Sequence, residues 1–335
     1  MAVKRFKMDN HLRVAFATDD GYIAMTGIAM YSLFDNNQEF EYITVYILDN
    51  CISEEGKDQL REIATYFRRQ IEFLDCSSIG EWLGNEVMEM FRNENTNVPV
   101  TSYSRLFLSE LLNEDIDKIL YLDADSIILG SYVDLWNKNI DEYAVLGVLD
   151  NVNCDARIRV GLPENFGYIN AGVLLMNLAY LRKINFVARV RNFIKKYQGR
   201  VFHHDQGIIN GVLNERIGIL PVQYNMLSFL FEQNSVKKII EMYDIPIFYS
   251  EQEYRLAKEN PIFIHFTEGY LQRPWVKKSK HPLKAKWMEY RSKTIWKSEK
   301  LQEDKRSNKL RILAWMNLNL PIKLTKILIA LFRNE

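Results

Sequence analysis

The sequence is poor in the residues that mark disulfide-rich, zinc-binding and fibrous proteins. Its 335 residues include three cysteines, Cys51, Cys76 and Cys154, which lie far apart and form no C-x-x-C pair. Neither a disulfide framework nor a cysteine zinc site is therefore indicated, and a reducing compartment such as the cytoplasm is expected. Fifteen glycines and eight prolines are too few for a fibrous or low-complexity chain.

Long hydrophobic stretches are also missing. The first residues, MAVKRFKMDNH, contain no apolar segment of a signal peptide, and no uncharged apolar run reaches about 18 residues. We therefore expect neither a secretion signal nor a membrane-spanning helix. With 47% hydrophobic and 13% aromatic residues the chain can still bury a large core. Its length predicts one domain of about 250 residues with an appendage, or two smaller domains.

The formal net charge is zero, but the two signs are unevenly distributed. Of 43 basic and 43 acidic residues, positions 273–335 hold 17 basic and 5 acidic ones, so this segment carries +12 and residues 1–272 carry −12. Such asymmetry predicts an acidic body and a basic tail that meets an anionic partner. We accordingly predict a main domain over 1–275 and a basic, tryptophan-rich helical extension over 276–335.

Short apolar segments alternate with amphipathic helical segments along the body. The predicted strands are 13–17, 42–48, 71–74, 118–122, 144–149, 171–178 and 261–266. Most are apolar on both faces, which is typical of parallel strands covered by helices. Ser53 marks a helix start between two of them, because its hydroxyl can cap free N–H groups. The sequence thus predicts an α/β fold with a mostly parallel sheet flanked by helices.

Two carboxylates stand at the end of one predicted strand, in KILYLDADSIILG (118–130). Asp123 and Asp125 are two residues apart, so their side chains point to the same side of an extended chain. Their mutual repulsion favours a divalent cation, and oxygen ligands favour Mg²⁺, Mn²⁺ or Ca²⁺. A D-x-D pattern is also common in exposed turns. Its place between two apolar runs, at the end where parallel sheets bind nucleotides, favours the metal site.

His265 lies inside the last predicted strand, IFIHF. A lone histidine there is more often a hydrogen-bonded core residue than a ligand. The segment after it, TEGYLQRPW, supplies a glycine, an arginine and a tryptophan, which suit a diphosphate and its metal. Further polar motifs are FATDDGY (16–22), TSYSRLFL (101–108), NAGVLLMNL (170–178) and HHDQGIIN (203–210). Taken singly, these motifs are better explained as a turn, a surface arginine or a helix cap.

Taken together, the motifs resemble glycosyltransferase family 8, the retaining nucleotide-sugar transferases that include lipopolysaccharide α-galactosyltransferases and glycogenin. From about Arg13 to Trp275 they follow the family's order: FATDDGY, SRLFLSELL, YLDADSIIL, INAGVLLMNL, DQGIIN and HFTEGYLQRPW. The resemblance implies a GT-A fold, which is a Rossmann-like nucleotide-binding α/β domain with the metal motif at its sheet edge. Residues 1–275 would then be the catalytic domain.

The resemblance also implies roles for individual residues. Asp123, Asp125 and His265 would bind Mn²⁺, with Mg²⁺ as the alternative ion. Contacts with the nucleotide-sugar are implied for Ala17, Asp19, Tyr22, Arg105, Asp123, Asn170, Gly269 and Arg273. Asp150, Asp205 and Gln206 are placed around the reacting sugar, as the candidate catalytic residues.

The chain departs from the family pattern at three places. The family's H-x-x-G-x-x-K-P-W is lengthened by two residues, and Arg273 replaces the lysine. The family's D-Q-D reads D-Q-G, with Gly207 in the third position, and Gly21 stands where the family often has asparagine. The last two changes concern the donor sugar more than the type of reaction.

The reaction implied by the resemblance is retaining transfer of galactose or glucose from a UDP-sugar to a saccharide or lipid-linked acceptor. The pathway would be lipopolysaccharide or surface polysaccharide synthesis. Alternatives are a glycogenin-like self-glucosylating protein, a nucleotidyltransferase, and a binding module for metal or nucleotide-sugar without transferase activity. A dehydrogenase is disfavoured, because neither G-x-G-x-x-G nor a P-loop follows the first strand.

The tail ends in an amphipathic basic helix predicted to start at Pro321. One side carries Lys323, Lys326 and Arg333, and the other carries Leu324, Ile327, Leu328, Leu331 and Phe332. Four of the six tryptophans also lie in the tail. The helix either docks on the body with its basic face in solvent, or attaches the protein peripherally to the anionic inner face of the cell membrane. Nucleic acid is not expected as a partner, because no known binding module accompanies the charge.

Overall fold

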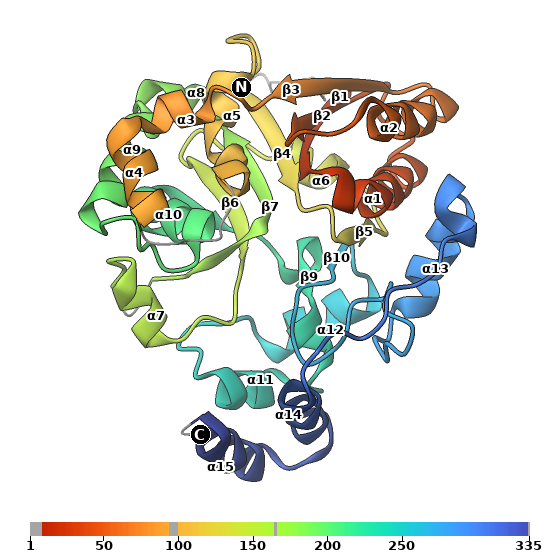
Figure 1. Cartoon of the computed structure of the whole chain (residues 1–335), viewed down its shortest axis with the longest axis vertical. Coiled ribbons are helices and arrows are strands. Elements are labelled where there is room, and N and C mark those ends of the chain that lie inside the picture. The colour runs from red at the N-terminus through yellow and green to blue at the C-terminus, as the bar shows by residue number, and fades with distance from the viewer. Residues whose placement is uncertain (1–8, 94–99, 164–165, 334–335) are drawn as a thin grey trace, which may run out of the picture.

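The computed structural model describes residues 9–93, 100–163 and 166–333. At its centre lies a seven-stranded sheet in the order β3-β2-β1-β4-β7-β6-β8 (Figure 1). Its strands are β1 (His11–Thr18), β2 (Tyr42–Asp49), β3 (Gln70–Asp75), β4 (Lys118–Leu122), β6 (Val145–Leu149), β7 (Ile169–Asn177) and β8 (Ile217–Ile219). Neighbours pair in parallel except that β7 runs antiparallel to both β4 and β6. The predicted mostly parallel sheet is confirmed.

A second, three-stranded sheet lies beside the first. It consists of β5 (Ser126–Ile128), β10 (Phe263–His265) and β9 (Met226–Leu227). The antiparallel pairing of β10 with β5 sets His265 opposite Ser126, one residue beyond the D-x-D motif. The sequence did not predict β5, β8 or β9, because segments of two or three residues show no periodicity.

Helices cover both faces of the large sheet. One face is covered by α1 (Ile23–Asp35) and α2 (Glu54–Tyr66), and the other by α3 (Ile79–Leu83), α4 (Asn85–Asn93), α5 (Leu108–Leu111), α8 (Leu178–Lys183), α9 (Phe186–Lys196) and α10 (His204–Leu213). In β1, Val14 and Phe16 face the core that includes α1, and Ala15 faces the opposite core. This alternation is the two-residue period of an extended strand. A strand buried on both faces therefore reads as a continuous apolar run.

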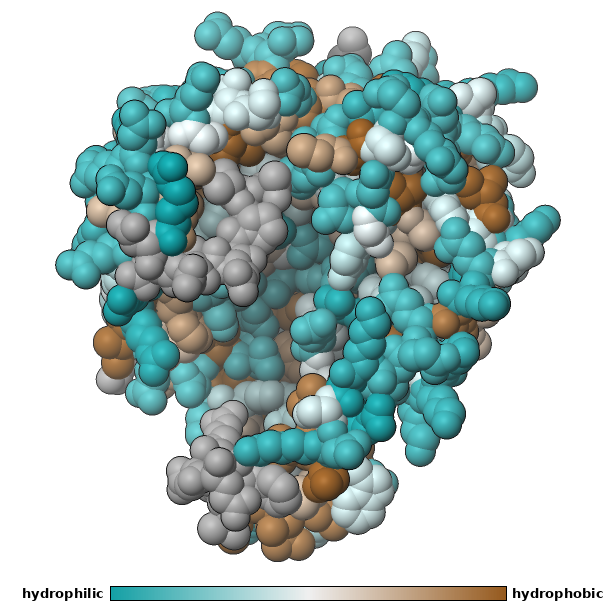
Figure 2. All heavy atoms as spheres, in the orientation of Figure 1, coloured by the Kyte–Doolittle hydropathy of each residue, from teal (hydrophilic) through white to brown (hydrophobic). Residues whose placement is uncertain are grey.

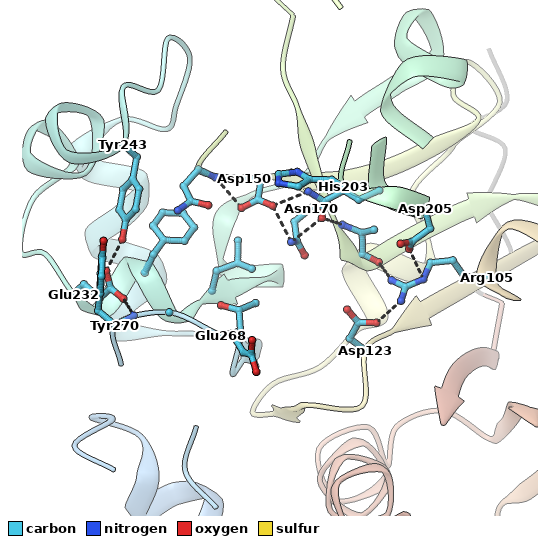
Figure 3. Close-up of a pocket in the computed structure, with 17 residues that line it drawn as sticks. Arg105, Asp123, Asp150, Asn170, His203, Asp205, Glu232, Tyr243, Glu268 and Tyr270 are labelled. Carbon is cyan, nitrogen blue, oxygen red and sulfur yellow. Dashed lines mark hydrogen bonds and ion pairs between the residues drawn. The ribbon is translucent and has the colours of Figure 1, made fainter. Parts of the chain in front are cut away.

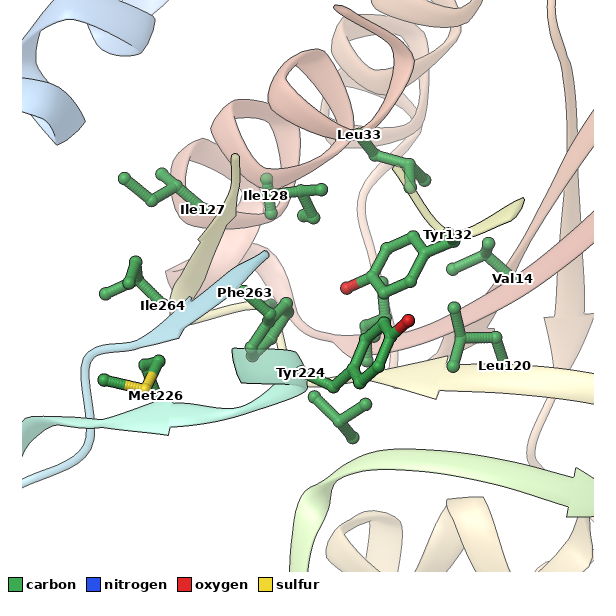
Figure 4. Close-up of a cluster of buried hydrophobic side chains, with 14 of the residues drawn as sticks. Val14, Leu33, Leu120, Ile127, Ile128, Tyr132, Tyr224, Met226, Phe263 and Ile264 are labelled. Carbon is green, nitrogen blue, oxygen red and sulfur yellow. The ribbon is translucent and has the colours of Figure 1, made fainter. Parts of the chain in front are cut away.

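Buried side chains fix the small sheet against the large one (Figure 4). The rings of Tyr132 and Tyr224 stack with their centroids 6.4 Å apart, and Phe263 of β10 and Leu120 of β4 pack in the same core. Each such fully buried side chain contributes about 1.5–3 kcal/mol to folding. The position of His265 relative to Asp123 is thus set by core packing.

The C-terminal part of the chain packs onto the body. After α6 (Val133–Trp136) and α7 (Cys154–Arg159), the remaining helices are α11 (Val236–Tyr243), α12 (Glu251–Glu259), α13 (Lys284–Ser292), α14 (Asn308–Asn319) and α15 (Ile322–Arg333). Trp275, Trp287 and Trp296 are buried in the core that includes α1. Trp296 lies so close to α1 that a Cβ on Gly27 would approach its ring to 2.2 Å. The helix predicted from Pro321 is confirmed as α15, while a domain boundary at residue 275 stays a prediction.

None of the helices in the described ranges is long and apolar enough to cross a membrane.

Candidate active site

The reversed direction of β7 gathers the polar motifs at one edge of the large sheet. Because β7 is antiparallel to its neighbours, its first residues lie beside the last residues of β4 and β6. The backbone N–H of Asp123 donates to the carbonyl of Gly172 at 2.8 Å, and that of Asp150 donates to Tyr168 at 2.9 Å. The D-x-D motif, Asp150 and the start of β7 therefore meet at the edge where such sheets bind ligands.

Asp123, Asp125 and His265 come together as the sequence predicted. One potential ligand atom from each lies within 4.8 Å of the others. The His265 Nε2 atom is 3.0 Å from Asp125 Oδ1 and 3.5 Å from Asp123 Oδ2. Glycine at position 172 makes room for the imidazole, because a Cβ there would lie 2.3 Å from His265 Cε1.

Electrostatics favour an ionised carboxylate at Asp125. Burial alone would raise the pKa of Asp125, but the neighbouring His265 and Arg273 outweigh burial and lower it. Burial likewise opposes a charged His265, yet the adjacent aspartates raise its pKa. Two carboxylates and one imidazole, converging on a common point and only 4–22% exposed, suit a divalent cation that accepts oxygen and nitrogen ligands. The donor set fits a cation such as Mn²⁺, for which His265 Nε2 would be the nitrogen ligand.

Arg273 lies next to the triad, although the segment before it is two residues longer than in the family pattern. Its Nη2 is 3.0 Å from Asp125 Oδ2, its Nη1 donates to the Tyr22 hydroxyl at 2.9 Å, and its Nε donates to the Phe266 carbonyl at 3.0 Å. Beside it lies a cavity of about 490 Å³, which has the volume of typical ligand pockets. Its lining includes Ala17, Asp19, Tyr22, Arg105, Asp123, Asp125, Asp205 and Arg273.

Arg105 bridges two of the predicted carboxylates. It lies 3.1 Å from Asp123 Oδ1 and 2.9 Å from Asp205 Oδ2, and it donates to the Ala171 carbonyl at 2.8 Å. Burial raises the pKa of Asp205, although the adjacent Arg105 acts in the opposite direction. The guanidinium also stacks over the ring of Tyr121, whose hydroxyl donates to Asp123 at 2.9 Å. The sequence did not single out Tyr121, because it resembles the other apolar residues of β4.

Amide side chains surround Asp150, in a group that we call the amide network: Asp150, Asn170, Gln206 and Asn225. Asp150 Oδ2 accepts from Asn170 at 3.0 Å and from Gln206 at 2.9 Å. Asn170 Oδ1 accepts from Asn225 at 2.9 Å. Asn225 is fully buried and was not predicted, since it stands in YNML, outside every motif.

The departure at Gly207 has a steric reason. His203 and His204 have left-handed backbones, with φ of 56° and 48°, and the turn they make brings the Phe202 carbonyl against α10. A Cβ at position 207 would lie 1.9 Å from that oxygen. Glycine is therefore required for this turn, which places Asp205 and Gln206 on the first turn of α10.

Glu232 anchors the loop that follows His265. The carboxylate accepts from the backbone N–H groups of Tyr270 and Leu271 at 3.0 and 3.4 Å, from Asn317 of α14 at 3.0 Å, and from the hydroxyl of Tyr243. Burial raises the pKa of Glu232, although these donors oppose the shift. The sequence did not single out Glu232, because it lies far from every motif that it contacts.

A cavity of about 560 Å³ joins these groups. Figure 3 shows Arg105, Asp123 and Asp205 on one side of it, Glu232, Tyr243 and Tyr270 on the other, and Asp150, Asn170 and His203 between them. Gly269 and Gln206 also line this cavity. It shares Arg105, Asp123 and Asp205 with the cavity beside Tyr22, so the two adjoin. In Figure 2 the middle of this face is hollowed and mainly hydrophilic.

Comparisons with known proteins agree with this geometry. The model of the family described as "Glycosyl transferase family 8" matches residues 13–279. General stress protein A of Bacillus subtilis is 24% identical over 87% of this chain and 96% of its own length. A lipopolysaccharide 1,2-glucosyltransferase of Escherichia coli is 26% identical over 78% of this chain and 72% of its own.

The fold also matches the solved structure of a glycosyltransferase. The galactosyltransferase LgtC, crystallised with donor and acceptor sugar analogs, superposes with a TM-score of 0.69 over 85% of this chain and 96% of its own, at 21% identity. The predicted GT-A fold is thereby confirmed, and so is the resemblance drawn from the motifs. Since the family model covers most of the sequence, the chain belongs to glycosyl transferase family 8.

Proposed function

We propose that the protein transfers galactose or glucose from a UDP-sugar to a saccharide or lipid-linked acceptor, with retention of the anomeric configuration. One observation carries this proposal. The metal-ligand candidate Asp123 and side chains of the amide network line the same cavity. A charged leaving group and a polar acceptor can thus lie side by side. The relatives with lipopolysaccharide glucosyltransferase activity in their names support a role in lipopolysaccharide or surface polysaccharide synthesis.

The donor nucleotide is assigned to the cavity beside Tyr22. The Tyr22 ring offers a stacking surface for uracil, and the Asp19 carboxylate and the Ala17 backbone can hydrogen-bond the uridine. Arg105 and Arg273 both line this cavity, and Arg105 also lines the adjoining cavity of about 560 Å³, so the diphosphate would lie beside these two guanidinium groups. A guanidinium pairs with phosphate oxygens in bidentate fashion, so Arg273 can replace the family's lysine.

A divalent cation would be held by Asp123, Asp125 and His265, with Mn²⁺ preferred and Mg²⁺ as the alternative. When bound there, such an ion supplies Lewis-acid neutralisation of the diphosphate leaving group. Arg273 adds positive charge at the same place, because it already contacts Asp125. Electrostatic stabilisation of departing charge is commonly the largest single contribution to catalysis.

The amide network suits front-face displacement. The bond between C1 of the sugar and the β-phosphate oxygen breaks, with its electron pair leaving on UDP. The acceptor oxygen bonds to C1 from the same face, and its proton passes to the departing phosphate oxygen. Asp150 Oδ2 already accepts two amide hydrogen bonds, which favours orienting the acceptor over attacking C1. Gln206 can steady the sugar, since an amide is a weak nucleophile, unlike the carboxylate pair of retaining hydrolases.

A panel of UDP-sugars tests this function. With Mn²⁺ present, UDP release is expected from UDP-galactose or UDP-glucose, slowly without acceptor and faster with one. The product anomer, read by NMR from a ¹³C-labelled donor, is expected to be α, and a β-linked product would exclude retention. A mass increase of the protein itself would instead indicate self-glucosylation. Metal binding without any UDP release would indicate a binding module.

We also propose that the C-terminal helices attach the protein to the cytoplasmic face of the cell membrane. Trp315 and Ile327 are 58% and 59% exposed, and brown atoms gather over this end of the molecule in Figure 2. Exposed apolar neighbours on α14 and α15 are Leu310, Ile312, Leu318 and Leu324. A tail net charge of +12 would add attraction to anionic lipid, about 1 kcal/mol for each basic residue near the surface.

Sedimentation with phosphatidylglycerol liposomes tests the attachment. The protein is expected to pellet with these vesicles and to stay in solution with neutral ones. The double change Trp315→Ser and Ile327→Ser should release it, while Tyr66→Ser, which removes an even more exposed ring from α2, should not. Equal recovery of all three proteins in the supernatant would rule out the attachment.

A further inference from the structure

The loop that follows His265 borders two cavities. One is the cavity of about 560 Å³ at Asp150, which we call the central cavity, and the other has a volume of about 480 Å³. Glu268 and Gly269 line both cavities, so they form part of the wall between them. Both residues are exposed, and side-chain packing therefore gives this wall little support. Its position depends on hydrogen bonds of the neighbouring backbone.

Tyr270, the residue after this wall, is hydrogen-bonded on both sides of its Cα atom. Its N–H donates to Glu232 Oε1 at 3.0 Å (Figure 3), and its carbonyl accepts from Arg306 Nη1 at 3.1 Å. These two bonds together restrict both backbone dihedrals of Tyr270. A Cβ on Gly269 would lie 3.1 Å from Glu232 Oε1, so the glycine lets the backbone approach the carboxylate. We call Glu232 and Arg306 the Tyr270 clamp.

Both members of the clamp are themselves held by other side chains. Glu232 is 9% exposed, and its Oε2 accepts from Asn317 of α14 and from the hydroxyl of Tyr243 of α11. Together with the N–H groups of the loop, these donors use most of the acceptor capacity of the carboxylate. Arg306 pairs with Asp304, with its Nε atom 3.2 Å from Oδ1. Side chains that are already fixed can hold a backbone segment at little further cost in entropy.

The length of the loop makes such a clamp necessary. The segment between His265 and Arg273 is two residues longer than in the family pattern. A longer loop loses more conformational entropy when it is ordered. Arg273 fixes the far end of the segment, because its Nε donates to the Phe266 carbonyl at 3.0 Å. The clamp fixes the middle of the segment at Tyr270.

We propose that Glu232 and Arg306 are positioning residues of the transferase. By fixing the wall at Glu268 and Gly269, they keep water away from the donor sugar. The inference rests on the proposed function, in which the sugar reacts in the central cavity beside Asp150. If water replaces the acceptor, its oxygen bonds to C1, UDP leaves with the electron pair of the broken bond, and the proton passes to the departing phosphate. A site closed to bulk water suppresses this hydrolysis.

Hydrolysis of the donor in the absence of acceptor tests the clamp. With Mn²⁺ and UDP-galactose or UDP-glucose, Arg306→Ala is expected to release UDP and free sugar about 10-fold faster than the wild type, at an unchanged KM for the donor. A folding defect would lower this rate instead of raising it. Arg311→Ala is the matched control. It removes another partner of Asp304, at 3.2 Å, but leaves the bond from Arg306 to Tyr270 in place, so it should keep the wild-type rate.

A second pair of variants and a second measurement address Glu232. Glu232→Ala should also raise hydrolysis, and Glu232→Gln should raise it less, because its amide oxygen can still accept from the Tyr270 N–H. Hydrogen exchange of the Tyr270 and Leu271 amides, which needs no turnover, should be faster in Arg306→Ala and Glu232→Ala than in the wild type. Unchanged exchange, unchanged hydrolysis, or an equal rise in Arg311→Ala would overturn the role of the clamp. A wild type that releases no UDP, with exchange altered as expected, would instead contradict the transferase function and with it the exclusion of water.

Discussion

The two sides of the central cavity hold their carboxylates in opposite ways. On one side Asp125 contacts a histidine and an arginine, and Asp123 contacts a histidine and a second arginine. On the other side Asp150 is held by neutral amides. The first arrangement suits a diphosphate with its cation, and the second suits sugar hydroxyls. One sheet edge thereby serves a charged and a neutral ligand at once.

Carboxyl pKa values show the same contrast. The positive neighbours of Asp125 lower its pKa in spite of burial. Glu232, held by a tyrosine hydroxyl, an asparagine and backbone N–H groups, has a raised pKa because burial prevails. Hydrogen bonds alone compensate for lost hydration less than a neighbouring cation does. Asp205 marks the limit of this contrast, because burial raises its pKa although Arg105 lies beside it.

The largest expected effect comes from breaking the charged side. Asp125→Asn removes a metal-ligand candidate and the partner of both His265 and Arg273, so UDP release with Mn²⁺ should fall about 10³-fold. The circular dichroism spectrum should not change. Asp58→Asn, an exposed change on α2, is the control and should retain full activity. Unchanged activity of Asp125→Asn in metal-replete buffer would refute the metal assignment.

The next largest effect is expected at Gly207. This glycine follows directly after Asp205, which belongs to the charged side, and Gln206, which belongs to the neutral side, so a change here should disturb both sides. Gly207→Ala would place a Cβ against the Phe202 carbonyl, so we expect a loss of about 1–3 kcal/mol in unfolding free energy and a strong loss of activity. Denaturant unfolding measures the loss in stability, and UDP release measures the loss of activity. In Gly80→Ala the new Cβ would meet no atom closer than 3.8 Å, so this control should stay near wild-type stability. Equal behaviour of the two variants would contradict the steric reading.

A change confined to the neutral side should show that the two sides act independently. Asn225→Ala removes the hydrogen bond that orients Asn170, and we expect kcat/KM for acceptor to fall about 10- to 100-fold. The Mn²⁺ concentration that gives half-maximal activity should not change, because the triad keeps its contacts. A shift of that concentration comparable to the loss in kcat/KM would show that the two sides are not independent.

The smallest expected effect is on the pH dependence of stability. The folded-state pKa of Glu232 lies above its ordinary value of 4.5, so between the two values the folded protein binds more protons than the unfolded chain. This group therefore makes stability fall as pH rises through that window. In Glu232→Gln the melting temperature should fall less steeply over this range than in the wild type. Glu62→Gln, an exposed change on α2, should keep the wild-type slope.

Much of the charged side could be predicted from the sequence. Asp123 and Asp125 end an apolar strand, and His265 lies inside another, so local patterns place them at or near a sheet edge. The motif order then implied that they share a site, and the structure brings them within 4.8 Å. Gly207 looked like a departure that concerned the donor sugar. The structure adds a steric reason for the glycine, because a Cβ there would meet the Phe202 carbonyl at the turn formed by His203 and His204.

The neutral side was predicted in part. Asp150, Asn170 and Gln206 were expected around the reacting sugar, but Asn225, Glu232 and Asn317 were not. These three side chains come from segments without periodicity or motif. Their contacts with Asn170, with the Tyr270 backbone and with one another join residues that are 38 to 85 positions apart in the chain. Such contacts follow from how the small sheet and α14 pack on the body, which no local pattern encodes.

The amino-acid sequence by itself determined the α/β class, the main strands, the metal-ligand candidates and the basic tail, because these depend on local periodicity and charge. Only the tertiary structure decided that β7 runs against its neighbours, which brings its first residues to the edge where Asp123 and Asp150 lie. It also decided that the cavity at Asp150 adjoins, at His203 and Tyr243, a further cavity whose lining reaches α15. Both outcomes arise from packing between distant segments, where the burial of side chains selects one arrangement among many that the local sequence would allow.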